Sequence, residues 1–373
     1  MEITAAVARA IGGRFTLEQL SLAEPRSDEV LVRLVATGIC HTDISMRDHK
    51  IYPIPHPVVL GHEGAGIVER VGDAVKNVAV GDHVVLTSNS CGHCPSCVEA
   101  LPVYCYEFND YNFSGTRRDG SSPLSLDGGK VHYFHSQSSF ATHSVAHERC
   151  VVRVRKDAPL ELLGPLGCGV MTGSGAVVNS MKVGVGKSIA VFGTGSVGLS
   201  AIMAAKLVGA GIIIAVDQVP ARLALALELG ATHAIDATAG QVAEAIRAIC
   251  RHGVDYTLDT TGNMKVLRTA MDMLAPRGTC GYVGGAPPGA AVTIDVEQVM
   301  VGGRTIRGII EGDSNPNVFL PHLIDLYMLG RFPFDRLVRF YPFESINEAA
   351  ADALSGSTIK PVLRFAASPP PAR

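Results

Sequence analysis

The stretch Ile189-Ala190-Val191-Phe192-Gly193-Thr194-Gly195-Ser196-Val197-Gly198 determines the architecture of the second half of this chain. An apolar strand runs into a G-x-G-x-x-G turn, and an apolar helical pattern follows at once. The same alternation of apolar runs and helical patterns extends from about residue 187 to 307. Strands that are apolar throughout and are separated by helices are typical of βαβ units. We therefore predict an α/β fold with a doubly wound parallel sheet.

The glycine turn also predicts a dinucleotide site. Gly193 permits the tight turn, Gly195 lets a pyrophosphate approach the backbone, and Gly198 lets helix and strand pack closely. Free N–H groups at the helix start, around Ser196 and Val197, and the positive potential there suit phosphates. A glycine-rich turn of purely structural use is the alternative.

An acidic residue in the right place supports the dinucleotide interpretation. Asp217 ends the next apolar strand, 217 − 198 = 19 residues beyond the last glycine. Its carboxylate should accept hydrogen bonds from the adenosine ribose, and its charge would repel a 2′-phosphate. NAD is therefore favoured over NADP, although Arg222 is near enough in sequence to soften the preference.

Four cysteines form a second motif of the pattern C-x2-C-x2-C-x7-C. They are Cys91, Cys94, Cys97 and Cys105. Thiols at this spacing suit one tetrahedral zinc ion with Zn–S distances of ~2.3 Å. Because four cysteines leave no open position, we expect a structural metal. Core thiols or a disulfide cluster are the alternatives.

Three more candidate metal ligands lie far apart in the sequence. Cys40, His62 and Cys168 each follow an apolar stretch in a turn-like segment. Two thiolates and one imidazole would leave a fourth zinc position open, as in catalytic sites. Spacing alone does not establish this set, since isolated cysteines and histidines are usually core residues.

The composition of the remaining chain indicates a β-rich first part and argues against a nucleic-acid-binding or membrane protein. Residues 1 to about 165 contain β-branched runs such as 30–35, and residues 359–363 look extended. We expect the tail, 368–373, to be disordered. The net charge is −3 without a basic stripe, which argues against nucleic acid. The apolar stretch 188–205 approaches the length of a membrane span, but glycines interrupt it. We therefore expect it to form a strand, a turn and a helix in the core of a soluble protein. Nine cysteines without an export signal indicate a cytoplasmic protein.

Taken together, these motifs resemble the zinc-dependent medium-chain alcohol dehydrogenases over essentially the whole chain. The resemblance rests on Gly-His-Glu-Gly-Ala-Gly at 61–66, the four-cysteine run, Cys168 and the glycine turn, in the family's order. It implies three segments: a GroES-like catalytic domain with a structural zinc lobe, a Rossmann cofactor domain, and a return to the catalytic domain. The segments are 1–169 with the lobe at about 91–105, then 170–311, then 312–373. Finer similarities point to the aryl- and allylic-alcohol branch, and the stretches that carry them are 90–94, 137–140, 162–169 and 310–313.

The resemblance implies a role for each residue near the metal. Cys40, His62 and Cys168 would bind the catalytic zinc, Glu63 would lie beside it, and Asp43 would orient His62. Zinc would lower the pKa of the alcohol, whose hydride would pass to nicotinamide.

The proton relay departs from the family pattern. Thr42 would carry the substrate proton outward through its hydroxyl. Ser45 stands where liver-type members place a histidine, so the relay would end at water, at His41 or at His49.

The resemblance also implies the residues around cofactor and substrate. His41 and Lys360 would contact the cofactor phosphates, and Thr172 and Val283 would lie at the nicotinamide end. The complete cofactor set is His41, Thr172, Gly193, Gly195, Ser196, Val197, Gly198, Asp217, Arg222, Val283 and Lys360. The residues that would line the substrate pocket are Thr87, Phe134 and His135.

The sequence thus predicts a reversible, NAD-dependent oxidation of primary alcohols, aromatic or allylic, to aldehydes, with two zinc ions per chain. The expected partners are a small alcohol or aldehyde and a second copy of the chain, paired through edge strands of the cofactor domain; a tetramer is the alternative. A glutathione-dependent formaldehyde dehydrogenase is a competing prediction, for which Arg117 and Arg118 would supply cations. A non-catalytic NAD-binding protein is another.

Overall fold

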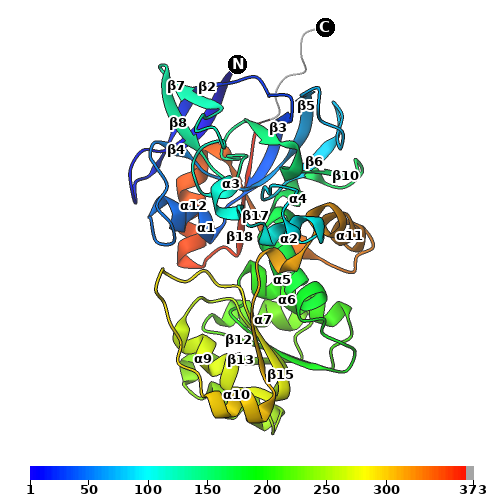
Figure 1. Ribbon diagram of the computed structural model, residues 1–373. Coiled ribbons are helices and arrows are strands. Elements are labelled where there is room, and N and C mark those ends of the chain that lie inside the picture. The colour runs from blue at the N-terminus through cyan, green and yellow to red at the C-terminus, as the bar shows by residue number, and fades with distance from the viewer. Residues whose placement is uncertain (367–373) are drawn as a thin grey trace. The chain divides into compact units, whose positions relative to one another are not determined.

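The computed structural model describes residues 1–366, so the tail predicted to be disordered lies outside the described residues. The chain forms two compact units (Figure 1). Unit 1 comprises Met1–Cys168, Asn315–Met328 and Asp335–Arg373, and unit 2 comprises Gly169–Ser314 and Leu329–Phe334. The sequence predicted that the first segment ends at residue 169 and the second at residue 311. The structure ends them at Cys168 and Ser314, one residue earlier and three residues later. The sequence did not suggest that the segment Leu329–Phe334 belongs with unit 2.

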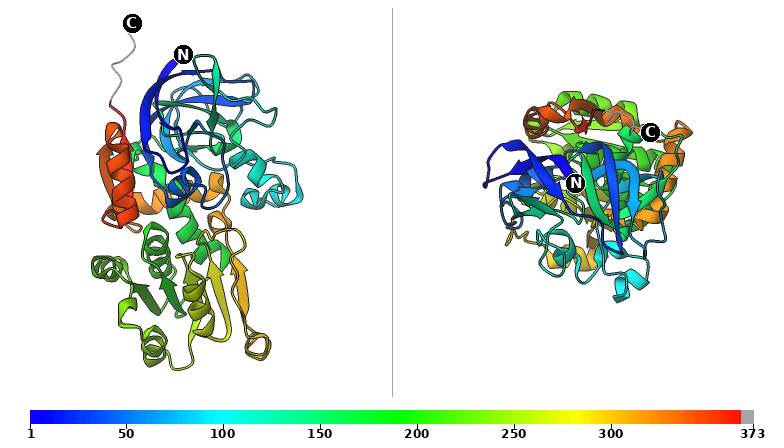
Figure 2. Two further views of the ribbon diagram at one scale, coloured as in Figure 1. Left: turned by 90° about the vertical axis from the view of Figure 1, so that its left-hand side faces the viewer. Right: turned by 90° about the horizontal axis from the view of Figure 1, so that it is seen from above.

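Unit 1 begins with a small closed barrel near the N-terminus (Figure 2). Its strands, in spatial order, are β1 (Glu2–Ala8), β2 (Phe15–Leu22), β7 (Leu124–Leu126), β8 (Gly129–Tyr133) and β4 (Val58–Val59). The first two strands form an antiparallel pair in which Glu2 faces Ser21 and Ala8 faces Phe15. Ala5, Val7 and Leu20 are fully buried, so this pair supplies part of the hydrophobic core.

A second sheet of unit 1 brings the candidate site residues together. Its strands, in order, are β10 (Val151–Val154), β6 (His83–Leu86), β5 (Glu63–Val71), β3 (Glu29–Gly38), β18 (Lys360–Arg364) and β17 (Val338–Pro342), and β9 (His143–His147) also pairs with β3. In the antiparallel register, Gly38 at the end of β3 faces Glu63 at the start of β5. Ile39 N donates to Pro361 O on β18 at 2.9 Å. Three strand ends therefore meet at one point.

Short helices surround these sheets in unit 1. They are α1 (His41–Arg47), α2 (Pro95–Val98), α3 (Phe108–Asn112), α4 (Leu160–Leu163), α11 (Pro316–Met328) and α12 (Ile346–Ser355). The first follows β3 directly, and Cys40 is its N-cap residue. The next two helices lie inside and just after the four-cysteine run.

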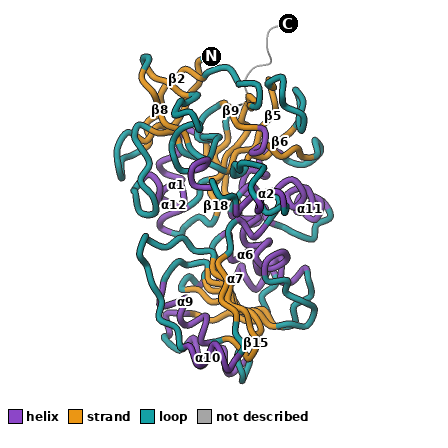
Figure 3. Tube along the Cα trace, viewed as in Figure 1, coloured by secondary structure: helices purple, strands orange, loops and turns teal. Residues whose placement is uncertain are grey.

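Unit 2 is built around a six-stranded parallel sheet flanked by helices (Figure 3). Its strands, in spatial order, are β13 (His233–Asp236), β12 (Ile212–Asp217), β11 (Ser188–Phe192), β14 (Val254–Asp259), β15 (Leu274–Tyr282) and β16 (Thr305–Gly308). Its helices are α5 (Gly169–Gly175), α6 (Ser196–Leu207), α7 (Pro220–Leu229), α8 (Val242–Ile249), α9 (Met264–Asp272) and α10 (Val296–Gly302).

The strand order of this sheet confirms the predicted doubly wound α/β architecture. The chain runs outward from β11 through β12 to β13, then returns to the other side of β11 and continues through β14. A reversal of this kind leaves a crevice at the carboxyl end of the central strands, where ligands bind in open α/β sheets. The glycine turn follows β11 at that end. Ile189 to Phe192 are all buried, as expected for a central parallel strand.

Across residues 1–366, no single helix has the length and apolar character needed to cross a bilayer, although one bent pair, Leu160–Gly167 with Gly169–Ser180, passes by length and composition.

Candidate active site and metal centres

The four residues Cys40, His62, Glu63 and Cys168 form one compact cluster in unit 1. Each offers a ligand atom, and these atoms all lie within 4.8 Å of one another. The register of β3 and β5 brings Cys40 to His62 and Glu63. Cys168 joins them because the turn before it packs on β5 so closely that a Cβ on Gly164 would lie 2.3 Å from Glu63 O. Residues that are distant in sequence thus form a set of metal donors.

The imidazole of His62 is oriented for metal binding. Its Nδ1 lies 2.8 Å from Asp43 Oδ1, and the same oxygen accepts from Gly61 N at 3.0 Å. The second carboxylate oxygen of Asp43 accepts from Cys40 N at 2.9 Å. Nε2 of His62 is buried and has no hydrogen-bond partner. A buried nitrogen without a partner is costly unless a metal takes its lone pair, so the residues fit a zinc ion.

The electrostatics of the cluster favour a thiolate. A hydrogen bond from Cys168, with the charges of Lys360 and His62, holds the pKa of Cys40 well below its usual value, although burial opposes this shift. The thiolate is the form of cysteine that binds zinc. The donor set of two thiols and one imidazole, with a carboxylate beside it, matches zinc with an open position.

The negative charge of the buried Glu63 carboxylate is compensated by an ion pair with a buried lysine. Lys360 Nζ lies 2.8 and 3.0 Å from the two carboxylate oxygens of Glu63 and 3.2 Å from Ile39 O, and both charged side chains are buried. Burial raises the pKa of Glu63 to about 7, although the charge of Lys360 opposes this rise. Three acceptors in unit 1 thus bind Lys360 Nζ. Its predicted contact with the cofactor phosphates stays a prediction.

The predicted relay residues occupy different environments on and after α1. Thr42 Oγ1 lies 3.6 Å from Cys40 Sγ, next to the metal cluster. His41 is exposed at the start of the helix. His49 Nε2 lies 2.8 Å from Ile54 O, so this imidazole forms a local hydrogen bond within the loop after α1. The structure thus brings Thr42, but not His49, to the cluster.

The four-cysteine run forms a second compact cluster. The ligand sulfurs of Cys91, Cys94, Cys97 and Cys105 lie within 4.8 Å of one another, and all nine cysteines of the chain are free thiols. Backbone N–H groups point at these sulfurs: Cys94 N lies 3.2 Å from Cys91 Sγ, and Cys91 N lies 3.2 Å from Cys105 Sγ. Such donors stabilise thiolates, so the cysteine lobe fits a tetrahedral zinc ion.

The glycine turn in unit 2 has the geometry of a phosphate cradle. Gly193 has a φ of +89°, which favours glycine. A Cβ on Gly198 would lie 1.8 Å from Gly193 O, so that glycine is required by packing. A Cβ on Gly195 would meet no atom within 4 Å. The protein leaves this space open at the N-terminus of α6, which fits a pyrophosphate.

Asp217 is held by four donors of the chain itself. One oxygen accepts from Thr194 N at 2.5 Å and Thr194 Oγ1 at 2.7 Å, and the other accepts from Gln218 N at 2.7 Å and Val219 N at 3.0 Å. Burial opposes ionisation, but these hydrogen bonds lower the pKa of Asp217. No pattern in the sequence indicated that Thr194 would bind this carboxylate.

The remaining cofactor candidates lie on elements of unit 2. Arg222 is in the first turn of α7, and Val283 directly follows β15, where its N–H donates to Asp259 O at 3.0 Å. Thr172 lies on α5, with its hydroxyl 3.4 Å from Glu311 Oε2. Their contacts with a cofactor stay predictions.

An aromatic cluster lies beside the metal cluster, and the sequence revealed only part of it. Its members are Tyr52, Phe108, Phe113, Phe134 and His135. The ring centroids of Phe134 and His135 lie 5.6 and 4.9 Å from that of His62. Phe113 lies 5.1 Å from His135 and stacks on Tyr52 at 5.3 Å. The rings therefore extend from the metal ligand to Tyr52, which is 41% exposed.

The candidate pocket residue Thr87 is fully buried. Its hydroxyl donates to Gly167 O at 3.0 Å, so it packs against the turn that leads to Cys168.

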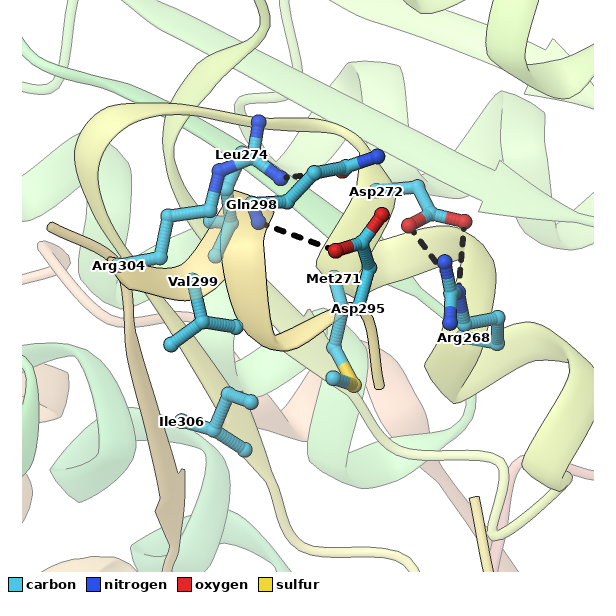
Figure 4. A pocket seen from close by; sticks show the side chains of 9 residues that line it. All are labelled: Arg268, Met271, Asp272, Leu274, Asp295, Gln298, Val299, Arg304 and Ile306. Carbon is cyan, nitrogen blue, oxygen red and sulfur yellow. Dashed lines mark hydrogen bonds and ion pairs between the residues drawn. The ribbon is translucent and has the colours of Figure 1, made fainter. Parts of the chain in front are cut away.

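A separate pocket in unit 2 contains none of the predicted site residues (Figure 4). It is lined by Arg268, Met271, Asp272, Leu274, Asp295, Gln298, Val299, Arg304 and Ile306. Arg268 is paired with Asp272 at 2.9 Å, and Asp295 accepts from Gln298 N at 3.1 Å. Its acidic groups are thus used in local structure.

Comparisons with known proteins agree with this geometry. Residues 26–156 match the family described as "Alcohol dehydrogenase GroES-like domain", and residues 196–327 match "Zinc-binding dehydrogenase". The chain is 46% identical over 364 residues to geraniol dehydrogenase of Castellaniella defragrans, covering 97% of each chain. The chain belongs to the zinc-dependent alcohol dehydrogenases.

Solved structures of this dehydrogenase family superpose closely on the chain. Benzyl alcohol dehydrogenase from Acinetobacter calcoaceticus is 47% identical with a TM-score of 0.95, over 98% of this chain and 100% of that one. An alcohol dehydrogenase zinc-binding domain protein from Burkholderia ambifaria is 55% identical with a TM-score of 0.96, over the same shares. The predicted family and its aryl- and allylic-alcohol branch are confirmed.

Proposed function

We propose that this alcohol dehydrogenase oxidises aromatic or allylic primary alcohols to aldehydes with NAD, at a zinc ion held by Cys40, His62 and Cys168. The observation that carries the proposal is the buried Nε2 of His62, which lacks a partner and lies beside two thiols and an aromatic cluster. When bound, zinc lowers the pKa of a coordinated alcohol, and NAD accepts a hydride.

The chain's own residues have defined tasks in this proposal. Asp43 fixes the tautomer of His62, because it accepts the proton on Nδ1. Thr42 receives the alcohol proton at its hydroxyl oxygen and passes its own proton outward. Lys360 compensates the charge of Glu63, so that this carboxylate stays buried beside the cluster.

The aromatic cluster supports the substrate class. Aromatic rings prefer offset or edge-on contact with other rings, and they exclude water from the reacting atoms. The two relatives named for geraniol and benzyl alcohol are consistent with allylic and aromatic substrates.

The choice of NAD and the second zinc ion are further parts of the proposal. Asp217 ends β12 as an ionised carboxylate, which disfavours a 2′-phosphate. The clustered sulfurs of the cysteine lobe would hold one structural zinc ion, which gives two per chain.

We also propose a homodimer in the cytoplasm. β16 is the last strand of its sheet, and no described strand covers its outer side. On the neighbouring α10, Val296, Met300 and Val301 are 69, 73 and 75% exposed. An open strand edge with exposed apolar side chains suits pairing with a second copy. Nine free thiols suit a reducing compartment. Sedimentation velocity would test the dimer.

The glutathione-dependent alternative has less support. It needs free cations for a charged adduct, but Arg117 makes a bidentate ion pair with buried Glu29 at 2.6 and 2.7 Å. Arg118 pairs with Asp110 at 2.8 Å and Glu107 at 2.7 Å.

The test is a steady-state panel with benzyl alcohol, geraniol, ethanol and formaldehyde plus glutathione, each with NAD and with NADP. We expect the largest kcat/KM for benzyl alcohol or geraniol with NAD. A preference for ethanol or for the glutathione adduct would refute the substrate class. Metal analysis of wild type and Cys168→Ala would test the site, because only one of two zinc ions should be lost.

A further inference from the structure

The two ends of the cysteine lobe are joined by a pair of buried asparagines. Asn89 lies two residues before Cys91, and Asn112 ends α3, which begins three residues after Cys105. Asn89 N donates to Asn112 Oδ1 at 2.8 Å, and Asn112 Nδ2 donates to Asn89 O at 3.0 Å. Asn112 Nδ2 also donates to Phe108 O at 2.8 Å. We call this reciprocal pair the asparagine clasp; both residues are at most 2% exposed.

The clasp also holds a neighbouring turn, residues 134–139, here called the His135 turn. His135 N donates to Asn112 O at 3.0 Å, and Asn89 Nδ2 donates to Ser136 Oγ at 3.1 Å. Ser136 Oγ in turn donates to Tyr111 O at 2.9 Å. The clasp therefore holds the His135 turn by two hydrogen bonds, one from the backbone N–H of His135 and one to the side chain of Ser136.

The His135 turn has a backbone that needs such support. His135, Ser136 and Ser138 have φ values of 51, 51 and 52°, in the left-handed region that is unfavourable for residues other than glycine. Such a backbone conformation persists only where the surrounding structure imposes it. Its other end is fixed by Ser138 Oγ, which donates to Val59 O at 2.7 Å.

This turn packs directly on the candidate catalytic site. The imidazole of His135 lies 4.9 Å from that of His62 with the planes tilted by 34°, and Phe134 contacts His62 edge-on at 5.6 Å. Ser139 N donates to Gly61 O at 2.9 Å, one residue before His62. Displacement of the turn would therefore change the packing of a metal ligand.

We propose that Asn89 and Asn112 are positioning residues that couple the cysteine lobe to the catalytic metal site by holding the His135 turn against His62. A metal held by the lobe would fix Cys91 and Cys105, and thereby the distance between Asn89 and Asn112. The lobe thus acts on the reaction at a distance, through one hydrogen-bonded turn. This rests on the proposed function only in taking the Cys40, His62 and Cys168 cluster as the catalytic site.

The experiment uses the complete enzyme with cobalt(II) at the catalytic site and compares Asn112→Asp with Asn109→Asp. The first variant loses both amide donors and places a carboxylate against two carbonyl oxygens. Asn109 is exposed on the same helix, so its variant controls for the added charge. We expect Asn112→Asp to shift the cobalt absorption bands and to release the catalytic metal to a chelator about 10-fold faster, with the control unchanged.

An unchanged cobalt spectrum in folded Asn112→Asp, whether or not the lobe keeps its metal, would overturn the proposal. If that variant does not fold, Ser136→Ala decides, because it removes the hydrogen bonds of Ser136 Oγ with Asn89 Nδ2 and Tyr111 O and leaves both asparagines in place. A wild-type spectrum and release rate in Ser136→Ala would then overturn it. The spectrum does not depend on which alcohol reacts, so failure of this inference is separate from failure of the substrate assignment.

Discussion

Replacing Gly195 with alanine separates ligand binding from folding in the glycine turn. The residue has φ −73° and ψ −168°, which alanine adopts freely, and its Cβ would meet no atom within 4 Å. Alanine should stabilise the fold by about 0.4–1 kcal/mol through the unfolded state. It should lose about 0.5 kcal/mol as the N-cap of α6, where glycine is preferred. The two effects nearly cancel, so the free energy of unfolding should change by less than about 1 kcal/mol.

The same methyl group should weaken NAD binding strongly. It would occupy the space that the pyrophosphate needs, and overfilling a close contact costs about 1–3 kcal/mol. This corresponds to an increase of about 5- to 150-fold in the Kd for NAD. Gly198→Ala should behave in the opposite way, because its Cβ would lie 1.8 Å from Gly193 O and must move the backbone. That variant should lose about 1–3 kcal/mol of stability.

The assay is calorimetric titration with NAD, together with urea denaturation of each variant. Gly184→Ala is the matched control in unit 2, since its Cβ would meet only Lys187 Cγ at 3.8 Å. A Gly195→Ala protein that folds normally and binds NAD with the Kd of wild type would refute the phosphate assignment.

Three further predictions concern single side chains. Asp43→Asn should weaken the catalytic metal site by about 10- to 100-fold in chelator competition, because it disturbs the acceptor for His62. Thr42→Val should lower kcat by about 100-fold with unchanged zinc content, whereas His49→Gln should change it by less than about twofold; the reverse order would contradict the relay. Folding lowers the pKa of Asp217 from 3.8, so its ionised form stabilises the fold above that value. The stability difference between wild type and Asp217→Asn, followed by urea denaturation, should therefore shrink as the pH falls through and below 3.8; a difference that grows in acid would contradict the assignment.

Features encoded by short spacing were predictable from the sequence. The strand, glycine turn and helix at 189–198 lie within one βα unit, so local geometry places Gly193 and Gly198 as the motif requires. The four cysteines lie within 15 residues, and a chain this short wraps one ion by itself. In both cases the neighbours in space are also neighbours in sequence.

Charge pairing was not predictable in the same way. The sequence predicted a cofactor contact for Lys360 but not its ion pair with Glu63, which is 360 − 63 = 297 residues away. This contact depends on β18 lying beside β3, which no local pattern encodes. The asparagine clasp and the partners of Asp217 were missed for a related reason, because an isolated Asn or Thr is compatible with many roles.

By itself, the sequence determined the α/β class, the glycine turn and the cysteine lobe, because each is set by residues close together in the chain. Only the tertiary structure decided that Cys40, His62 and Cys168, spaced by 22 and 106 residues, share one centre. The register of β3 and β5 and the packing of the turn before Cys168 bring them together. The three ligands meet because of burial and strand pairing across the whole of unit 1. Spacing along the chain does not specify these long-range contacts.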